Sequence, residues 1–134
     1  MKPRVLIVDD SQYTVDMLRE MLAEDFEVVG ETGNGDEAVD LYDDLKPDVV
    51  VMDLVIAGTD GVTATERIKD HDPEATVLIL TSVDNERKQR EAFEAGADDY
   101  LRKPFDPDQL RESLQELAAG GADDEDDGGV DRNG

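Results

Sequence analysis

Short, continuous apolar runs alternate along this chain with longer segments in which apolar residues recur at the spacing of a helix. A continuous run rich in valine and isoleucine is typical of a parallel strand that is buried on both faces. Strands that alternate with helices predict an α/β fold, doubly wound around one parallel sheet. The five predicted strands cover residues 4–8, 27–31, 48–52, 76–80 and 98–101.

The segments between the strands carry helix signals. Asn34-Gly35 and Asp106-Pro107 are typical of the starts of the second and fifth helices, because Asn and Asp cap a first turn and proline suits the first helical position. Gly96 is predicted to end the fourth helix. The third helix, at about 62–71, has the weakest apolar stripe. The other stripes consist of Val15, Leu18 and Leu22; of Ala38, Leu41, Tyr42 and Leu45; and of Leu110, Leu114 and Leu117.

One domain is predicted over residues 1–119, followed by a disordered acidic tail over 120–134. The chain of 134 residues is long enough to fold without stabilising cross-links, and it has no cysteine for a disulfide. The tail contains a run of five acidic residues and has no apolar period. The apolar run near the N-terminus is too short for a signal peptide, and no run approaches a membrane span. We therefore expect a soluble, cytoplasmic protein.

The chain is strongly acidic, with 36 Asp and Glu against 13 Lys and Arg and a formal charge of −23. This charge argues against nucleic acid or an anionic membrane as the main partner, since both need basic patches. Self-repulsion at this charge opposes compaction, and salt near 1 M relieves it by reducing the Debye length to about 3 Å. The composition therefore favours a salt-rich, halophilic cytosol; an ordinary acidic protein with an acidic tail is the alternative.

Polar residues close four of the predicted strands. The carboxyl ends of parallel strands meet at one edge, where open α/β sheets keep their sites, so we expect these side chains to converge. Two like charges about 4 Å apart repel by roughly 4 kcal/mol at an effective dielectric of 20, so three carboxylates need a cation. Hard oxygen ligands in an incomplete shell suit Mg²⁺. The residues are Asp9 and Asp10 after the first strand, Asp53 after the third, Thr81 and Ser82 at the fourth, and Lys103 after the fifth.

Taken singly, these residues have simpler explanations: the aspartates could cap helices, Thr81 could be an ordinary strand residue, and Lys103 an ordinary turn residue. Taken together, and with Pro104 after Lys103, they resemble the receiver domain of two-component response regulators, most of all the single-domain chemotaxis type. The resemblance covers residues 4 to about 118. It implies a flavodoxin-like sheet with strand order 2-1-3-4-5.

The resemblance also implies a role for each site residue. Asp53 would be the phosphoacceptor, which takes a phosphoryl group from a histidine kinase. Mg²⁺ would be held by Asp9, Asp10, Asp53 and the backbone carbonyl of Val55, and would share the phosphoryl charge with Lys103. After modification, Thr81 and the amide of Ser82 would contact phosphoryl oxygens, and Tyr100 would be the aromatic residue that turns inward. The Lys103–Pro104 peptide bond would be cis and would aim the lysine inward.

The chain departs from the family pattern at two places. Ala57-Gly58 stands where the family has proline, which predicts a more flexible loop after the phosphoacceptor. Val55 and Val83 occupy the two positions that tune hydrolysis in the family, and neither side chain can form a hydrogen bond with a water molecule. His71, at the polar end of the third helix, is expected to be a surface residue and not a relay histidine.

We therefore expect a stand-alone phosphorylation switch for chemotaxis or motility, or alternatively a phosphorelay intermediate. It would be a monomer that binds an output protein on the face of the fourth helix, fifth strand and fifth helix. It would not be an enzyme beyond its own phosphorylation and dephosphorylation. A phosphohydrolase of the haloacid dehalogenase type would need an aspartate at the position of Val55. A nucleotide-binding domain would need a glycine-rich loop after the first strand, and a pseudo-receiver would not need the acidic cluster.

Overall fold

The computed structural model describes residues 1–123 of the chain. Its strands form one parallel, five-stranded sheet in the order β2-β1-β3-β4-β5, which confirms the predicted fold class. Each strand begins and ends within about one residue of its predicted bounds. The strands are β1 (Arg4–Val8), β2 (Glu27–Thr32), β3 (Val49–Met52), β4 (Val77–Thr81) and β5 (Asp99–Arg102).

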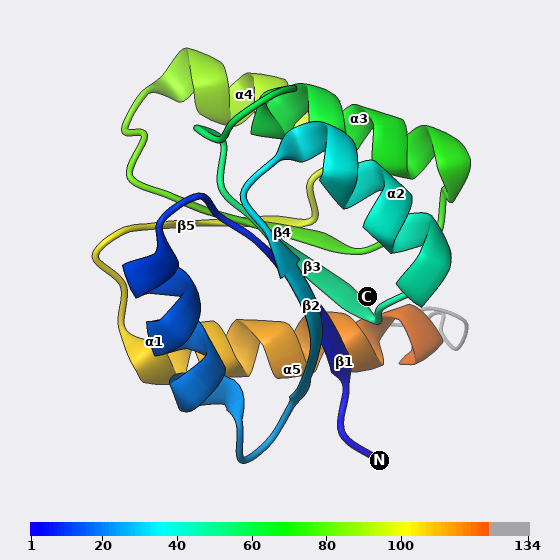
Figure 1. Cartoon of the computed structure of the whole chain (residues 1–134), viewed down its shortest axis with the longest axis vertical. Helices are drawn as coiled ribbons and strands as arrows, with labels where there is room; N and C mark the ends of the chain where they lie inside the picture. The colour runs from blue at the N-terminus through cyan, green and yellow to red at the C-terminus, as the bar shows by residue number, and fades with distance from the viewer. Residues whose placement is uncertain (124–134) are drawn as a thin grey trace, which may run out of the picture.

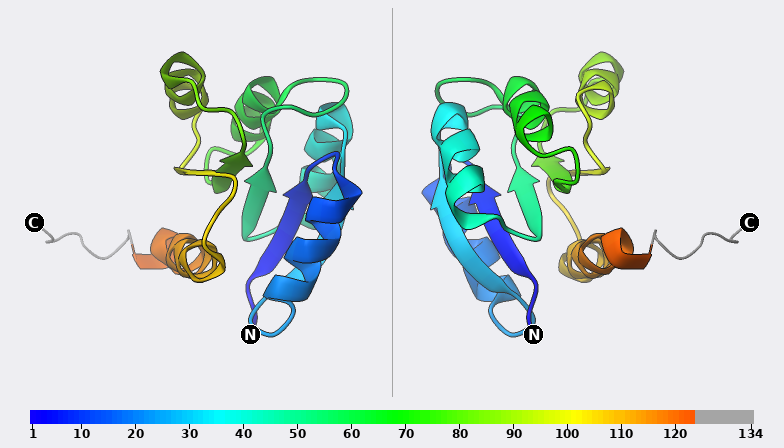
Figure 2. Two further views of the ribbon diagram at one scale, coloured as in Figure 1. Left: turned by 90° about the vertical axis from the view of Figure 1, so that its left-hand side faces the viewer. Right: turned by 90° about the vertical axis from the view of Figure 1, so that its right-hand side faces the viewer.

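Helices cover both faces of the sheet (Figures 1 and 2). Two of them, α1 and α5, pack on one face, and the other three pack on the opposite face. Among residues 1–123, no helix has the length and apolar character needed to cross a bilayer. The helices are α1 (Gln12–Leu22), α2 (Gly35–Leu45), α3 (Gly61–His71), α4 (Glu86–Glu94) and α5 (Pro107–Asp123).

The three central strands, β1, β3 and β4, are almost continuously apolar because successive side chains enter different cores. In β1, Val5 and Ile7 contact the core under α1 and α5, whereas Leu6 and Val8 contact the core under α2, α3 and α4. Every residue of β3 and β4 is buried. Burial on both faces leaves no position for a polar residue until the strand ends, so the polar residues gather at the strand ends.

Side-chain caps begin the helices at the carboxyl edge of the sheet. Asn34 accepts hydrogen bonds from the first turn of α2, as its position before Gly35 predicts. Asp60 caps α3, so this helix forms despite its weak apolar stripe. Pro107 is the first residue of α5, and Gly96, with a φ of +115°, follows the end of α4.

The predicted boundary between domain and tail is displaced, because α5 continues past residue 119 to Asp123. Glycine weakens a helix by about 1 kcal/mol relative to alanine but keeps its backbone N–H group, so the glycine pair at 120–121 does not stop the helix. The rest of the predicted acidic tail, 124–134, lies outside the described residues.

Gly61 is the first residue of α3, and its backbone lies close to the backbone of the loop that begins at Asp53. A Cβ atom at this position would lie 2.2 Å from the carbonyl oxygen of Asp53 and 2.6 Å from the Cα of Leu54. At Gly30 in β2, a Cβ would instead meet the end of the Leu45 side chain at 2.8 Å, which can move aside. Only the first contact forces the backbone apart.

We therefore expect Gly61→Ala to lower the free energy of unfolding by about 1–3 kcal/mol, since backbone atoms must shift to accept the methyl group. Gly30→Ala is the matched control and should lose less. Urea denaturation of the two variants measures the difference. Equal losses would contradict the backbone constraint at Gly61.

Candidate functional site

Two buried carboxylates share one ammonium group at the carboxyl edge of the sheet. The Nζ atom of Lys103 lies 2.7 Å from Oδ2 of Asp9 and 3.1 Å from Oδ2 of Asp53. The side chains of Asp9 and Asp53 are only 4% and 10% exposed. The hydroxyl of Thr81 donates a hydrogen bond of 2.7 Å to Oδ1 of Asp53. The structure thus brings together four of the predicted site residues, from the ends of four strands.

Backbone hydrogen bonds fix the two carboxylates. The N–H of Ser11 donates to Oδ1 of Asp9 at 2.9 Å, and the N–H of Val55 donates to Oδ1 of Asp53 at 3.2 Å. The N–H of Asp53 donates to the carbonyl of Val8, which extends the pairing of β3 with β1 by one residue. Both side chains are therefore held by the loops that begin directly after their strands.

Lys103 is held at the end of β5. Its N–H donates to the carbonyl of Thr81 at 2.8 Å, and the Lys103–Pro104 peptide bond is cis, which confirms that prediction. Burial alone would lower the pKa of the Lys103 amine. The hydrogen bond to Asp9 and the charges of Asp53 and Asp9 outweigh burial, so that the pKa of Lys103 is raised. The amine is therefore a full positive charge at neutral pH.

Asp10 does not join this cluster. Asp10 is exposed, so its charge is solvated and needs no partner. Within residues 1–123, no three His, Cys, Asp or Glu side chains lie close enough together to hold a metal ion. The three carboxylates predicted to converge are therefore a buried pair, Asp9 and Asp53, and an exposed neighbour in the sequence, Asp10.

The donor chemistry of these residues still fits Mg²⁺. Mg²⁺ prefers oxygen ligands, keeps several of its waters and commonly takes only one or two carboxylates from a protein. Asp9 and Asp53 present two carboxylates against a single ammonium, which leaves a net negative charge at the site. The exposed carboxylate of Asp10 follows Asp9 directly. A hydrated divalent cation suits this arrangement better than it suits a closed protein cage.

Tyr100 connects the site to the neighbouring surface. Its hydroxyl donates a hydrogen bond of 2.9 Å to the carbonyl of Val83, two residues after Thr81. Burial, and then the nearby charge of Asp84, raise the pKa of the Tyr100 hydroxyl. The ring packs against Phe93 of α4 with a centroid distance of 6.2 Å. Tyr100 therefore joins the loop after Thr81 to α4, while Ser82 in that loop is exposed.

The loop after Asp53 is tied to the loop between β2 and α2. The N–H of Ala57 donates to the carbonyl of Gly33 at 3.0 Å, and the N–H of Gly35 donates to the carbonyl of Ala57 at 2.9 Å. Sequence reasoning missed this contact; the two glycines around Asn34 are the signal that could have indicated a close approach of two backbones. Ala57 in place of proline predicts a more flexible loop; its N–H group also adds a hydrogen bond that holds the loop.

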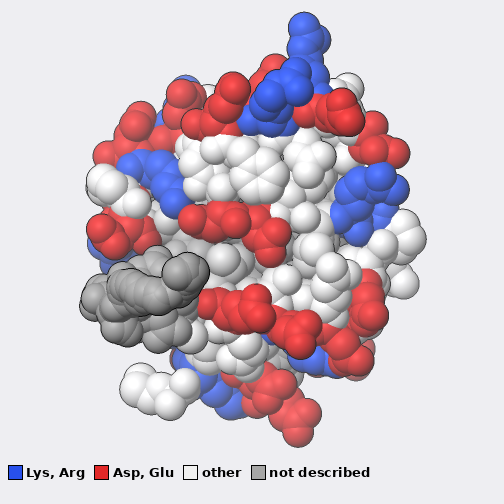
Figure 3. Space-filling view, turned by 180° about the vertical axis from the view of Figure 1, so that it is seen from behind, with Lys and Arg blue, Asp and Glu red and all other residues white. Residues whose placement is uncertain are grey.

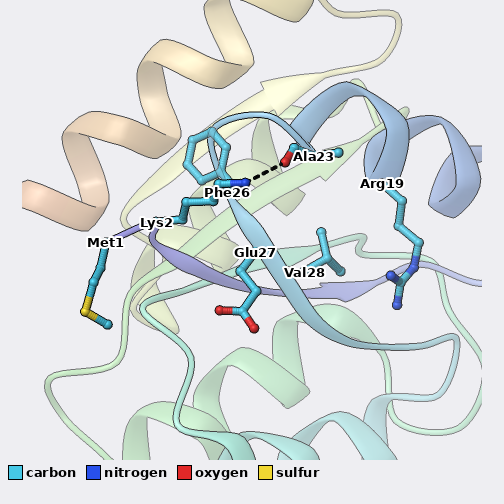
Figure 4. Close-up of a pocket in the computed structure, with 7 residues that line it drawn as sticks. All are labelled: Met1, Lys2, Arg19, Ala23, Phe26, Glu27 and Val28. Carbon is cyan, nitrogen blue, oxygen red and sulfur yellow. Dashed lines mark hydrogen bonds between the residues drawn. The ribbon is translucent and has the colours of Figure 1, made fainter.

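Two hollows in the molecule are lined by neither Asp9, Asp53 nor Lys103, so cavity size does not identify this site. A hollow of about 500 Å³ lies at the opposite, amino-terminal edge of the sheet, beside the starts of β1 and β2 (Figure 4). A smaller, mainly apolar hollow of about 300 Å³ is lined in part by Leu54, Val55 and Ile56, the residues directly after Asp53. The larger hollow is lined by Met1, Lys2, Arg19, Ala23, Phe26, Glu27 and Val28, and the smaller by Leu54, Val55, Ile56, Asp60, Val62, Val83 and Lys88.

Lys103→Met should lower the free energy of unfolding by about 1–3 kcal/mol in buffer without divalent cations, because it leaves two buried carboxylates without a counter-charge. Lys88→Met is the control, since Lys88 pairs with Glu91 at the surface, where both side chains are at least 40% exposed. Urea denaturation compares the two variants. A loss in Lys103→Met no larger than that in Lys88→Met would show that Lys103 does not stabilise the pair.

Comparisons with known proteins agree with this site. The family model described as "Response regulator receiver domain" matches residues 5–115. The chain is 41% identical over 117 residues to "Chemotaxis protein CheY" of Halobacterium salinarum, across 87% of this chain and 98% of the relative. It is 38% identical to the protein of the same name from Thermotoga maritima, across 88% and 99% of the two chains.

Solved structures show the same fold. A CheY-like receiver domain protein from Methanospirillum hungatei has a TM-score of 0.87 at 22% identity, across 92% of this chain and 99% of that one. CheY in a complex with CheX, BeF3 and Mg²⁺ from Borrelia burgdorferi has a TM-score of 0.80 at 28% identity, across 85% and 87%. From its site, its matching family model and its relatives, this chain belongs to the receiver domains of two-component response regulators.

Proposed function

We propose that this receiver is a phosphorylation switch in which Asp53 accepts a phosphoryl group from the phosphohistidine of a histidine kinase. The observation that carries the proposal is the pair of groups on the Asp53 carboxylate: the ammonium of Lys103 at one oxygen and the hydroxyl of Thr81 at the other. In the transfer, a bond forms between an Asp53 oxygen and phosphorus, and the bond between phosphorus and the imidazole nitrogen breaks. The imidazole leaves with the electron pair.

The chain's own residues stabilise the transferred group. The ammonium of Lys103, already beside Asp53, pairs with the phosphoryl oxygens that arrive there. The hydroxyl of Thr81 leaves Oδ1 of Asp53 and donates to a phosphoryl oxygen, and the backbone amide of Ser82 donates to another. When bound by Asp9, Asp10, Asp53 and the carbonyl of Val55, Mg²⁺ supplies further positive charge at these oxygens.

The comparisons support chemotaxis or motility control as the use of this switch. The relatives from Halobacterium salinarum and Thermotoga maritima both carry the name of a chemotaxis protein, and the structural relative from Borrelia burgdorferi was solved with BeF3 and Mg²⁺. A phosphorelay intermediate is the alternative within the same family. The acid required by a phosphohydrolase is replaced by Val55, whose side chain is apolar and 63% exposed. We therefore propose no reaction on outside substrates, and location in the cytoplasm stays a prediction.

The face of α4, β5 and α5 suits an output partner that carries acidic and apolar groups. Among residues 1–123, Arg87 and Arg90 of α4 are exposed and form no ion pair, although the chain has 36 acidic residues. Figure 3 shows the molecule from this side, with basic and acidic side chains along its upper margin above an uncharged area that acidic side chains interrupt. Phe93 is 43% exposed and packs on Tyr100. A change at Thr81 would reach this surface through the hydrogen bond of Tyr100 to Val83.

Incubation with acetyl phosphate and Mg²⁺ should add one phosphoryl group to Asp53, since a small donor can use the same in-line geometry as phosphohistidine. Asp53→Asn should abolish the added mass, whereas Asp60→Asn, which keeps the cap of α3, should retain it. Intact-mass and peptide mass spectrometry locate the group. A group on Thr81, Ser82 or His71 would show that the assignment of the phosphoacceptor is wrong.

Millimolar Mg²⁺ at fixed ionic strength should raise the melting temperature, because Mg²⁺ binds the folded site and the unfolded chain offers no such site. Asp10→Asn should lose most of this response, whereas Asp16→Asn in α1 should keep it. Fixing the ionic strength with KCl separates binding from the screening of the overall charge. An unchanged response in Asp10→Asn would contradict the role of Asp10 in holding the metal.

A further inference from the structure

A backbone bridge joins the loop that follows Asp53 to the loop between β2 and α2. Its two hydrogen bonds run from Ala57 N–H to the Gly33 carbonyl and from Gly35 N–H to the Ala57 carbonyl, at 3.0 and 2.9 Å. Asn34 and Ala57 form a parallel β-bridge, although both lie outside the named strands. The bridge therefore extends strand-like pairing above the edge of the sheet, four residues after Asp53.

The same loop also touches the acidic segment after β1. A Cβ atom on Gly33 would lie 2.8 Å from the Cα of Asp10, and a Cβ on Gly35 would lie 1.9 Å from the carbonyl oxygen of Thr59. Only glycine permits both approaches. Gly33 and Gly35 thus fix the loop between β2 and α2 against Asp10 on one side and against the loop that carries Val55 on the other.

Side chains reinforce the bridge at its outer end. The hydroxyl of Thr59 donates to the carboxylate of Asp36, and Nη1 of Arg67 lies 3.1 Å from Asp36 and 3.2 Å from the Thr59 hydroxyl. The hydrogen bond from Thr59, followed by the charge of Arg67, lowers the pKa of Asp36. Asp36 and Arg67 are more than half exposed, so this trio adds little to global stability and mainly orients the loop.

The bridge requires a residue with a backbone N–H group at position 57, and proline, the usual family residue there, has none. A proline ring at 57 would also place carbon where the Ala57 hydrogen meets the Gly33 carbonyl, which would push the two loops apart. The bridge in its present form therefore depends on this chain's departure from the family pattern.

We propose that Gly33 and Ala57 are positioning residues that hold the Val55 loop at a fixed distance from Asp10, and so strengthen Mg²⁺ binding at the site. The inference rests on the proposed function, because it concerns the metal that Asp10 and the Val55 carbonyl would hold. Partners of metal ligands commonly change affinity by tenfold or more without touching the metal. The bridge acts in this way through backbone atoms alone.

The test compares Ala57→Pro, which removes the N–H donor, with Ala57→Ser, which keeps it at the same exposed position. Calorimetric titration of the full chain with MgCl₂ at fixed ionic strength should give wild-type affinity for Ala57→Ser and roughly tenfold weaker binding for Ala57→Pro. Thr59→Val, which keeps the backbone bridge and removes one side-chain contact, should weaken binding less than Ala57→Pro. Amide hydrogen exchange without Mg²⁺ should show a protected Ala57 amide in the wild type.

Three outcomes would overturn the inference: wild-type Mg²⁺ affinity in a folded Ala57→Pro, an Ala57 amide that exchanges as fast as an unprotected one, or equal weakening by Ala57→Ser. If Ala57→Pro does not fold, Gly33→Ala decides, because its Cβ would lie 2.8 Å from the Cα of Asp10 and would push the loop away; wild-type Mg²⁺ affinity in that variant overturns the inference. A wild-type chain that neither binds Mg²⁺ nor accepts a phosphoryl group from acetyl phosphate would instead overturn the proposed function.

Discussion

The pairing of one ammonium with two buried carboxylates is the constraint on which this edge of the molecule depends. Lys103 follows β5, whereas Asp9 and Asp53 follow β1 and β3, and β4 lies between them in the sheet. The lysine therefore reaches across a neighbouring strand, and Thr81 of that strand donates to Asp53 as well. Without the ammonium, two carboxylates would face each other in a region with little water, where repulsion is weakly screened.

Basic residues are scarce in this chain, and the opposite edge of the sheet uses them in another way. Nη1 of Arg4 lies 2.8 Å from the carbonyl of Leu45 and 2.9 Å from that of Lys46, where α2 ends. The amine of Lys2 lies 3.1 Å from the carbonyl of Ala23, where α1 ends. These cations satisfy carbonyl groups that helix ends leave unpaired. At the amino-terminal edge of the sheet, cations thus cap the ends of helices, and at the carboxyl edge a cation holds two carboxylates together.

The sequence predicts the fold well because burial on both faces leaves a direct trace in it. β1, β3 and β4 are continuous apolar runs, and their ends are marked by the first polar residue. Local capping chemistry likewise places the starts of α2 and α5 correctly. The convergence of Asp9, Asp53, Thr81 and Lys103 follows from the strand order that the resemblance implies, since parallel strands bring their carboxyl ends together.

Contacts between surface segments that are distant in the sequence leave no such trace. His71 is exposed, as expected, yet its Nδ1 atom lies 2.8 Å from Asp43 of α2. Loop conformation also determines the bridge between Gly33 and Ala57 and the exposure of Asp10. No periodicity or cap encodes these distances, so the sequence predicts which residues gather at the site and leaves the details of their contacts open.

The apolar hollow after Asp53 has a consequence for timing. Val55 and Val83, which follow Asp53 and Thr81 by two residues each, line it, and their side chains carry only methyl groups. Water there finds no side-chain partner on either valine that would aim it at phosphorus. If Asp53 carries a phosphoryl group as proposed, its loss to water is expected to be slow, and a second protein that brings a polar group to this hollow would shorten its lifetime.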